Sequence, residues 1–241
     1  MVLVLVTIAA GVLWSLELNK APEKNVEVTL TGRLTTYRSA SDIFVVRNTS
    51  GNDGGVSDLI KLMGNEGLLF YKSLKAGKNR GPTGLIASDD VIIVKVNSQW
   101  DERGGTNTDL LKALLESITN HPDGFTGEII VADNGQAQFG SSGAGGSLNW
   151  GRSNAEDHSQ SVQKVVDLFS GSHKVSTYLW DTITGKRVYE YDKNDMEDGY
   201  VVNSTINPRT GIMISYPKFR TKFGTYVSFK LGVYDPQAHT Y

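Results

Sequence analysis

Polar residues follow two apolar runs of the sequence, and their types suit ligand binding or acid–base chemistry. Lys95 and Asn97 end the run VIIVKVN, and Asp133, Asn134 and Gln136 end EIIVADNGQ. In open parallel sheets, ligands bind beyond the carboxyl ends of the strands. If the two runs are neighbouring strands, these side chains converge. Lys95 and Asp133 are then the candidate catalytic pair, with Lys95 as an electrostatic partner or a general base.

Lys95 also has a purely structural interpretation. It lies within an apolar run, where an unpaired ammonium group would be costly to bury. Its obvious partner is Asp133, and an ion pair between them could simply join two strands. The sequence leaves both alternatives open.

A glycine-rich loop over residues 104–108 (GGTNT) opens a predicted helix. The free N–H groups and the dipole of a helix N-terminus attract anions, and Arg103 could hold a carboxylate or phosphate through two hydrogen bonds. The alternative is an ordinary helix cap, because the loop matches no nucleotide-binding motif. The candidate ligand-binding residues are Asn97, Arg103, Gly104, Gly105, Thr106, Asn107, Thr108, Asn134 and Gln136.

Composition excludes several other chemistries. The 241 residues contain no cysteine, so disulfides and thiolate metal ligands are absent from this chain. The net charge of −2 predicts no nucleic-acid partner.

None of the four histidines is spaced as a metal-binding pair, so we predict surface or capping positions for them and no metal site. The acidic run at 192–198 (DKNDMED) lacks the pattern of a calcium loop and is predicted to be a solvated turn. The cofactor and the oligomeric state stay open.

The elements that would position the site alternate between strands and helices. Residues 91–96 and 128–133 read as buried parallel strands, joined by a helix that begins near residue 108 with Asn107 or Thr108 as its N-cap. A helix near 56–67, a helix over 159–169 capped by Ser159, and a third strand at 174–180 are also expected. Further on, hairpins are predicted around residues 184–185 and over 211–235.

These patterns predict an α/β fold: a mostly parallel sheet flanked by helices, with a β-rich antiparallel C-terminal third. Residues 1–16 carry no charge, so residues 1–20 are expected to be an apolar N-terminal anchor or uncleaved signal, with a buried β-strand as the alternative. Residues 21–41 would be a linker and an edge strand, and residues 42–241 a single domain. The expected location is membrane-anchored or extracytoplasmic.

The middle of the chain resembles the Domain of Unknown Function 362 family. The resemblance lies in VIIVKVN followed by GGTNTD before a helix, in EIIVADNGQ, and in the later SYPKF and TYVSFKLGVYD. It covers roughly residues 40–241 and implies an α/β domain. Some family members carry a ferredoxin-type cluster segment, which implies redox or metallocofactor chemistry. The chain stops before the Lys–x–His type motif of the family, so this domain is expected to be incomplete at its C-terminus.

Two functional classes follow from these observations. One is a cofactor-handling or redox enzyme that binds a small anionic ligand or metallocofactor at the strand ends. The other is a non-catalytic, membrane-anchored binding or structural module. A pocket lined by Lys95, Asn97, Asp133 and Asn134 would favour the first class. A Lys95–Asp133 pair sealed by packing would favour the second.

Overall fold

A computed structural model describes residues 43–49, 51–98, 105–134, 151, 158–183 and 185–241 of the chain. The predicted anchor, linker and edge strand before residue 42 lie outside the described residues, as do Arg103, Gly104 and Gln136. No helix in the described part is long and apolar enough to cross a membrane. The predicted N-terminal anchor therefore stays a prediction.

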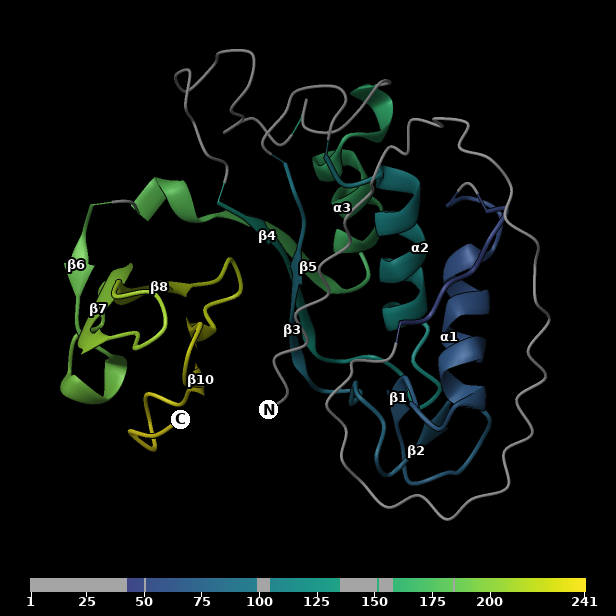
Figure 1. Ribbon diagram of the computed structural model, residues 1–241, viewed down its shortest axis with the longest axis horizontal. Coiled ribbons are helices and arrows are strands. Elements are labelled where there is room, and N and C mark those ends of the chain that lie inside the picture. The colour runs from purple at the N-terminus through teal and green to yellow at the C-terminus, as the bar shows by residue number, and fades with distance from the viewer. Residues whose placement is uncertain (1–42, 50, 99–104, 135–150, 152–157, 184) are drawn as a thin grey trace.

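The described chain is arranged in three layers (Figure 1). The central layer is a parallel sheet in the order β3-β4-β5, and helices cover one of its faces. A five-stranded sheet in the order β10-β9-β8-β7-β6 packs on the other face. The central strands are β3 (Val91–Lys95), β4 (Glu128–Asp133) and β5 (Lys174–Leu179). The helices are α1 (Gly55–Asn65), α2 (Thr108–Thr119) and α3 (Val162–Ser170).

The remaining strands are short or belong to the C-terminal third. That third contains β6 (Arg187–Val188), β7 (Gly199–Ile206), β8 (Met213–Arg220), β9 (Tyr226–Ser228) and β10 (Gly232–Tyr234). A small parallel ladder joins β1 (Tyr71–Lys72) to β2 (Arg80–Gly81). Short 3-10 turns are η1 (His158–Gln160), η2 (Trp180–Ile183) and η3 (Tyr191–Lys193).

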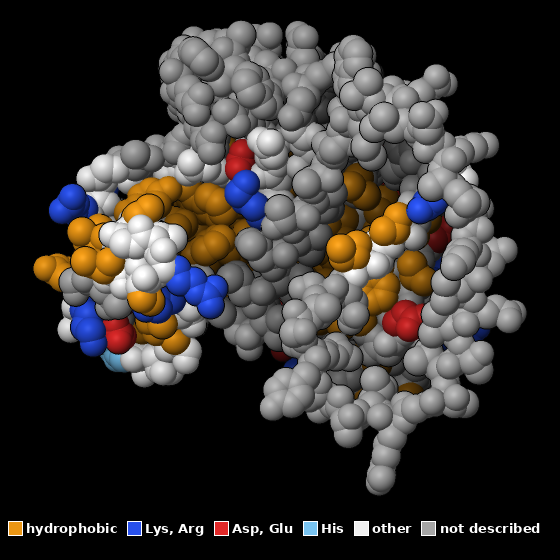
Figure 2. Space-filling model, viewed as in Figure 1, with side chains coloured by type: hydrophobic (Ala, Val, Ile, Leu, Met, Phe, Trp, Pro, Cys, Tyr) orange, Lys and Arg blue, Asp and Glu red, His pale blue; other side chains and the backbone are white. Residues whose placement is uncertain are grey.

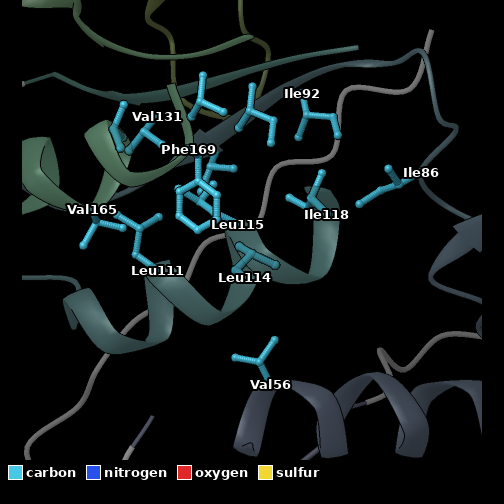
Figure 3. Close-up of a cluster of buried hydrophobic side chains, with 14 of the residues drawn as sticks. Val56, Ile86, Ile92, Leu111, Leu114, Leu115, Ile118, Val131, Val165 and Phe169 are labelled. Atoms are coloured by element: carbon cyan, nitrogen blue, oxygen red, sulfur yellow. The ribbon is translucent and has the colours of Figure 1, made fainter. Parts of the chain in front are cut away.

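Alternation along the central strands divides their side chains between two cores. Ile92 and Val131 point to the helices and pack with residues such as Leu115 (Figure 3). Ile93 and Ile130 point the other way and pack against the C-terminal sheet. Because successive strand residues face opposite sides, a strand buried on both sides must be apolar throughout. This explains the continuous apolar runs in the sequence.

The structure confirms the predicted strand–helix–strand unit. β3 and β4 are parallel, with Val91 opposite Glu128 and Lys95 opposite Ala132. β5 adds a third parallel strand beside β4. Asn107 caps α2, since its side chain accepts a hydrogen bond from the N–H of Leu110 at 2.9 Å.

Three predictions are corrected. The cap of α3 is Ser161, because residues 158–160 form η1 and Ser159 falls within that turn. The hairpin predicted around residues 184–185 is not found among the described residues, because residues 180–183 form η2 and not a strand. β6 pairs in parallel with β7, and η3 and the acidic loop carry the chain back to the start of β7. The C-terminal sheet is therefore mixed, with one parallel pairing beside three antiparallel ones.

Candidate functional site

The end of β3 and the end of β4 meet at a partly buried ion pair between Lys95 and Asp133. Because side chains alternate along a strand, Lys95 lies on the same face of the central sheet as Ile93, and Asp133 lies on the same face as Val131. These are opposite faces, so the ion pair reaches from one face to the other at the carboxyl ends of the strands. The ammonium group of Lys95 also donates to the carbonyl of Val96 at 2.6 Å.

Asp133 has further partners on its other oxygen. Its Oδ2 accepts the backbone N–H of Ser98 at 2.7 Å and the Ser98 hydroxyl at 2.9 Å. The Asp133 side chain is only 6% exposed, whereas that of Lys95 is 28% exposed. Ser98 was not predicted as a site residue, although its position three residues after Lys95, at the end of the same apolar run, could have indicated it.

The loop after β3 folds back on itself beside this pair. The Asn97 N–H donates to the Thr106 hydroxyl at 2.9 Å, and the Thr106 N–H donates to the Asn97 carbonyl at 3.0 Å. Thr106 is buried and Asn97 is exposed. Gly105 lies within the loop that these hydrogen bonds close, directly before Thr106.

Other predicted ligand-binding residues serve the helices. The Asn107 side chain is engaged in capping α2. Thr108 is buried and accepts a 3.4 Å hydrogen bond from Gln160. The structure thus brings Lys95, Asp133, Asn97 and Thr106 to one edge of the sheet but directs Asn107 and Thr108 toward local contacts.

Asn134 borders a hollow of about 440 Å³ at the end of β4. Most of the lining comes from the C-terminal sheet, in which strands far apart in sequence from β4 return beside it. The complete lining is Asn134, Gly185, Lys186, Arg187, Tyr200, Val202, Met213 and Ser215. Neither Lys95 nor Asp133 belongs to it.

Positive charge and hydrogen-bonding groups share this hollow. Arg187 is exposed and forms no ion pair with any described residue. Lys186 pairs with Glu197, and the pKa of Lys186 is raised chiefly by that hydrogen bond. The Tyr200 hydroxyl donates to the Asn134 side chain at 3.4 Å, which ties β7 to the end of β4. The arrangement can accept an anion through Arg187 and neighbouring donors.

A buried lysine in the C-terminal sheet also escaped sequence analysis. Lys218 is fully buried and donates to the carbonyls of Tyr189 and Asp195, each at 2.5 Å. Its ammonium group lies 4.2 Å from the centre of the Tyr191 ring. Burial lowers the pKa of Lys218, while the carboxylates of Asp195 and Glu190 oppose that shift.

The acidic run at 192–198 is mostly exposed, as predicted, but Asp195 and Asp198 also contact β8. Asp195 accepts the N–H groups of Tyr189 and Glu197 at 2.8 and 3.1 Å. Asp198 accepts the N–H of Arg220 at 2.9 Å. The sequence of β8 did not predict the burial of Lys218, because a lysine between Pro217 and Phe219 is expected to be exposed.

The histidines give no metal centre within the described residues, where no three His, Asp or Glu side chains are grouped to hold an ion. His121 is buried, not at the surface: its Nε2 lies 3.0 Å from the Ile86 carbonyl and its Nδ1 accepts the Asp123 N–H. It fixes the turn after α2.

Comparison with known proteins adds no assignment. No family model matches the chain, and no curated protein or solved structure matches it either. The candidate site must therefore be interpreted from its own geometry.

Proposed function

We propose that the chain is a non-catalytic binding module that holds a small anion in the hollow at the end of β4. The observation that carries the proposal is Arg187, an exposed guanidinium without a carboxylate partner among the described residues, beside Tyr200 and Ser215. A guanidinium binds carboxylate or phosphate oxygens in pairs. The proposal retains the anionic ligand expected from the sequence but assigns it to other side chains, since among the described residues Asn134 alone of the predicted ligand-binding residues lines the hollow.

A binding role suits the hollow better than catalysis. Its lining includes the Ser215 hydroxyl but no His, Asp or Glu that could act as a base. At the neighbouring edge, both oxygens of Asp133 are engaged by Lys95 and Ser98. A carboxylate with these partners is better suited to holding two strands and a loop together than to receiving a proton from a substrate.

The second candidate function is the cofactor-handling or redox enzyme, and Lys95 is the one residue that supports it. Its side chain is partly exposed, so a ligand could reach it. The resemblance to the Domain of Unknown Function 362 family and the redox or metallocofactor chemistry that it implies stay predictions.

Calorimetric titration of the full chain with inorganic phosphate tests the proposal. Arg187→Gln should weaken phosphate binding at least tenfold, which corresponds to about 1.4 kcal/mol. Arg47→Gln is the matched control, because Arg47 is an exposed arginine outside the hollow. This variant should bind phosphate with the affinity of the wild type. Lys95→Ala should also bind phosphate normally if folded. Failure of the wild type to bind phosphate, or equal losses in the two arginine variants, would reject the hollow as the site.

A further inference from the structure

The β7–β8 hairpin extends beyond the sheet to which it belongs. β6 pairs with β7 only at Tyr200 and Val201, and β9 pairs with β8 only from Lys218 onward. Among the described residues, the segment from Val202 to Ser215 therefore pairs only with itself, at Val202–Ser215 and at Ile206–Met213. This segment, residues 202–215, is called the hairpin arm below.

On both sides of the turn at its tip, the hairpin arm is apolar and exposed. The exposed fractions are 60% for Ile206, 66% for Ile212, 52% for Met213 and 37% for Ile214. Ile206 lies opposite Met213 and therefore shares its face, whereas Ile214, the next residue of β8, points to the other face. Apolar side chains thus occupy both faces of the arm. A protein partner docked on one face would leave the other face in water.

Charge on and beside the hairpin arm is positive. Residues 199–217 include no Asp or Glu, and Arg209 stands in the turn at the tip. At the base, Met213 and Ser215 line the same hollow as Arg187. Lys186 is also there, but Glu197 offsets its charge. Figure 2 shows hydrophobic side chains beside Lys and Arg side chains over the C-terminal strands, at the left of the view.

We propose that the hairpin arm inserts into the surface of an anionic membrane, with a lipid phosphate in the hollow at its base. This inference rests on the proposed function and specifies its ligand. From Ser215 to Ile212 the strand rises about 10 Å, and interfacial amphipathic helices bury their apolar face roughly 5–10 Å into the headgroup and acyl boundary. A phosphate held beside Ser215 would therefore leave Ile212 at the depth of the acyl boundary.

A fluorescent label at the tip gives a direct test on the full chain. The chain has no cysteine, so Thr210→Cys provides one attachment point for a polarity-sensitive dye. We expect its emission to shift to the blue with vesicles of equal parts phosphatidylcholine and phosphatidic acid, and much less with phosphatidylcholine alone. Leu74→Cys is the control, since Leu74 is an exposed residue outside the C-terminal sheet. Residues 1–16 carry no label in either protein, so their own interaction with lipid does not produce the signal.

Two variants in the labelled protein separate the parts of the inference. Replacing Ile212 and Ile214 together by Ser, which removes the apolar side chains without adding charge, should weaken the vesicle response at least about tenfold without changing phosphate affinity, because neither residue lines the hollow. Arg187→Gln should weaken both. A tip label that stays silent on vesicles while the hollow binds phosphate overturns the membrane inference and leaves the proposed function standing. A vesicle response that Arg187→Gln does not change overturns the lipid phosphate assignment. Loss of both signals in the wild type overturns both proposals.

Discussion

At the residue scale, Asp133 explains how a charge is accommodated at the end of a buried strand. The Lys95 ammonium balances its charge, and Ser98 supplies two hydrogen bonds to the second oxygen. A buried carboxylate without such partners would be strongly disfavoured. The pair therefore fixes the relative position of two strand ends and the loop that leaves β3.

The Lys95–Asp133 pair predicts a specific pattern of stability losses. Lys95→Ala should lower the free energy of unfolding by roughly 3 kcal/mol, the lower end of the range for breaking a buried pair, because Lys95 is partly exposed. The double variant with Asp133→Ala should recover part of that loss. Lys61→Ala, which breaks an exposed pair with Asp58 on α1, should cost about 0.5 kcal/mol or less. Urea denaturation measures all three. A loss no larger for Lys95→Ala than for Lys61→Ala would contradict the structural role.

The sequence indicated this pair but not the hollow beside it. Lys95 and Asp133 each lie at the end of an apolar run, and the carboxyl ends of neighbouring parallel strands lie side by side, so the sequence alone predicts that they meet. Arg187 and Tyr200 come from strands of the other sheet, and their approach to Asn134 depends on how that sheet packs. The burial of Lys218 could not be predicted for a similar reason, because its hydrogen-bond partners are more than twenty residues away in the sequence.

At the element scale, burial on both faces made the central strands recognisable, and local chemistry decided the helix ends. Asn107 was identified as a cap because a short polar residue directly precedes an apolar helical repeat. Before α3 there are two serines, and η1 displaces the helix start to the second. The parallel β6–β7 pairing was not predicted, because the sequence around residues 184–185 is typical of a hairpin turn, although residues 180–183 form η2.

The two serines give a test at this scale. The buried Ser161 side chain accepts the Lys164 N–H at the start of α3. Ser161→Ala should therefore lower the free energy of unfolding by about 1 kcal/mol. Ser159→Ala is the matched control and should cost clearly less. Thermal melts of the two variants compare them directly, and equal losses would contradict the assignment of the cap to Ser161.

At the scale of the whole molecule, the central sheet is shared by two cores. Its outer face meets the C-terminal sheet through Ile93, Ile130 and Phe219. The Phe219 ring stacks on Tyr178 of β5 at a centroid distance of 4.0 Å. At the other end of the interface, Thr225 donates a 2.5 Å hydrogen bond to the buried Glu128 of β4. The hollow depends on this interface, because Asn134 follows β4 of the central sheet, whereas the other lining residues come from the part of the chain after β5.

If the two sheets stabilise one another, a change in the C-terminal sheet should loosen the central one. Phe219→Leu removes a fully buried ring from β8 and should cost about 1–3 kcal/mol. Amide hydrogen exchange resolves individual strands, and the loss of protection should be as large in β4 as in β8 and β9. Phe223→Leu makes the same change at an exposed residue of the β8–β9 turn and should leave protection almost unchanged. Reduced protection confined to the C-terminal sheet would mean that the sheets unfold independently. In that case the hollow, which needs both, would open well before the central strands and their Lys95–Asp133 pair come apart.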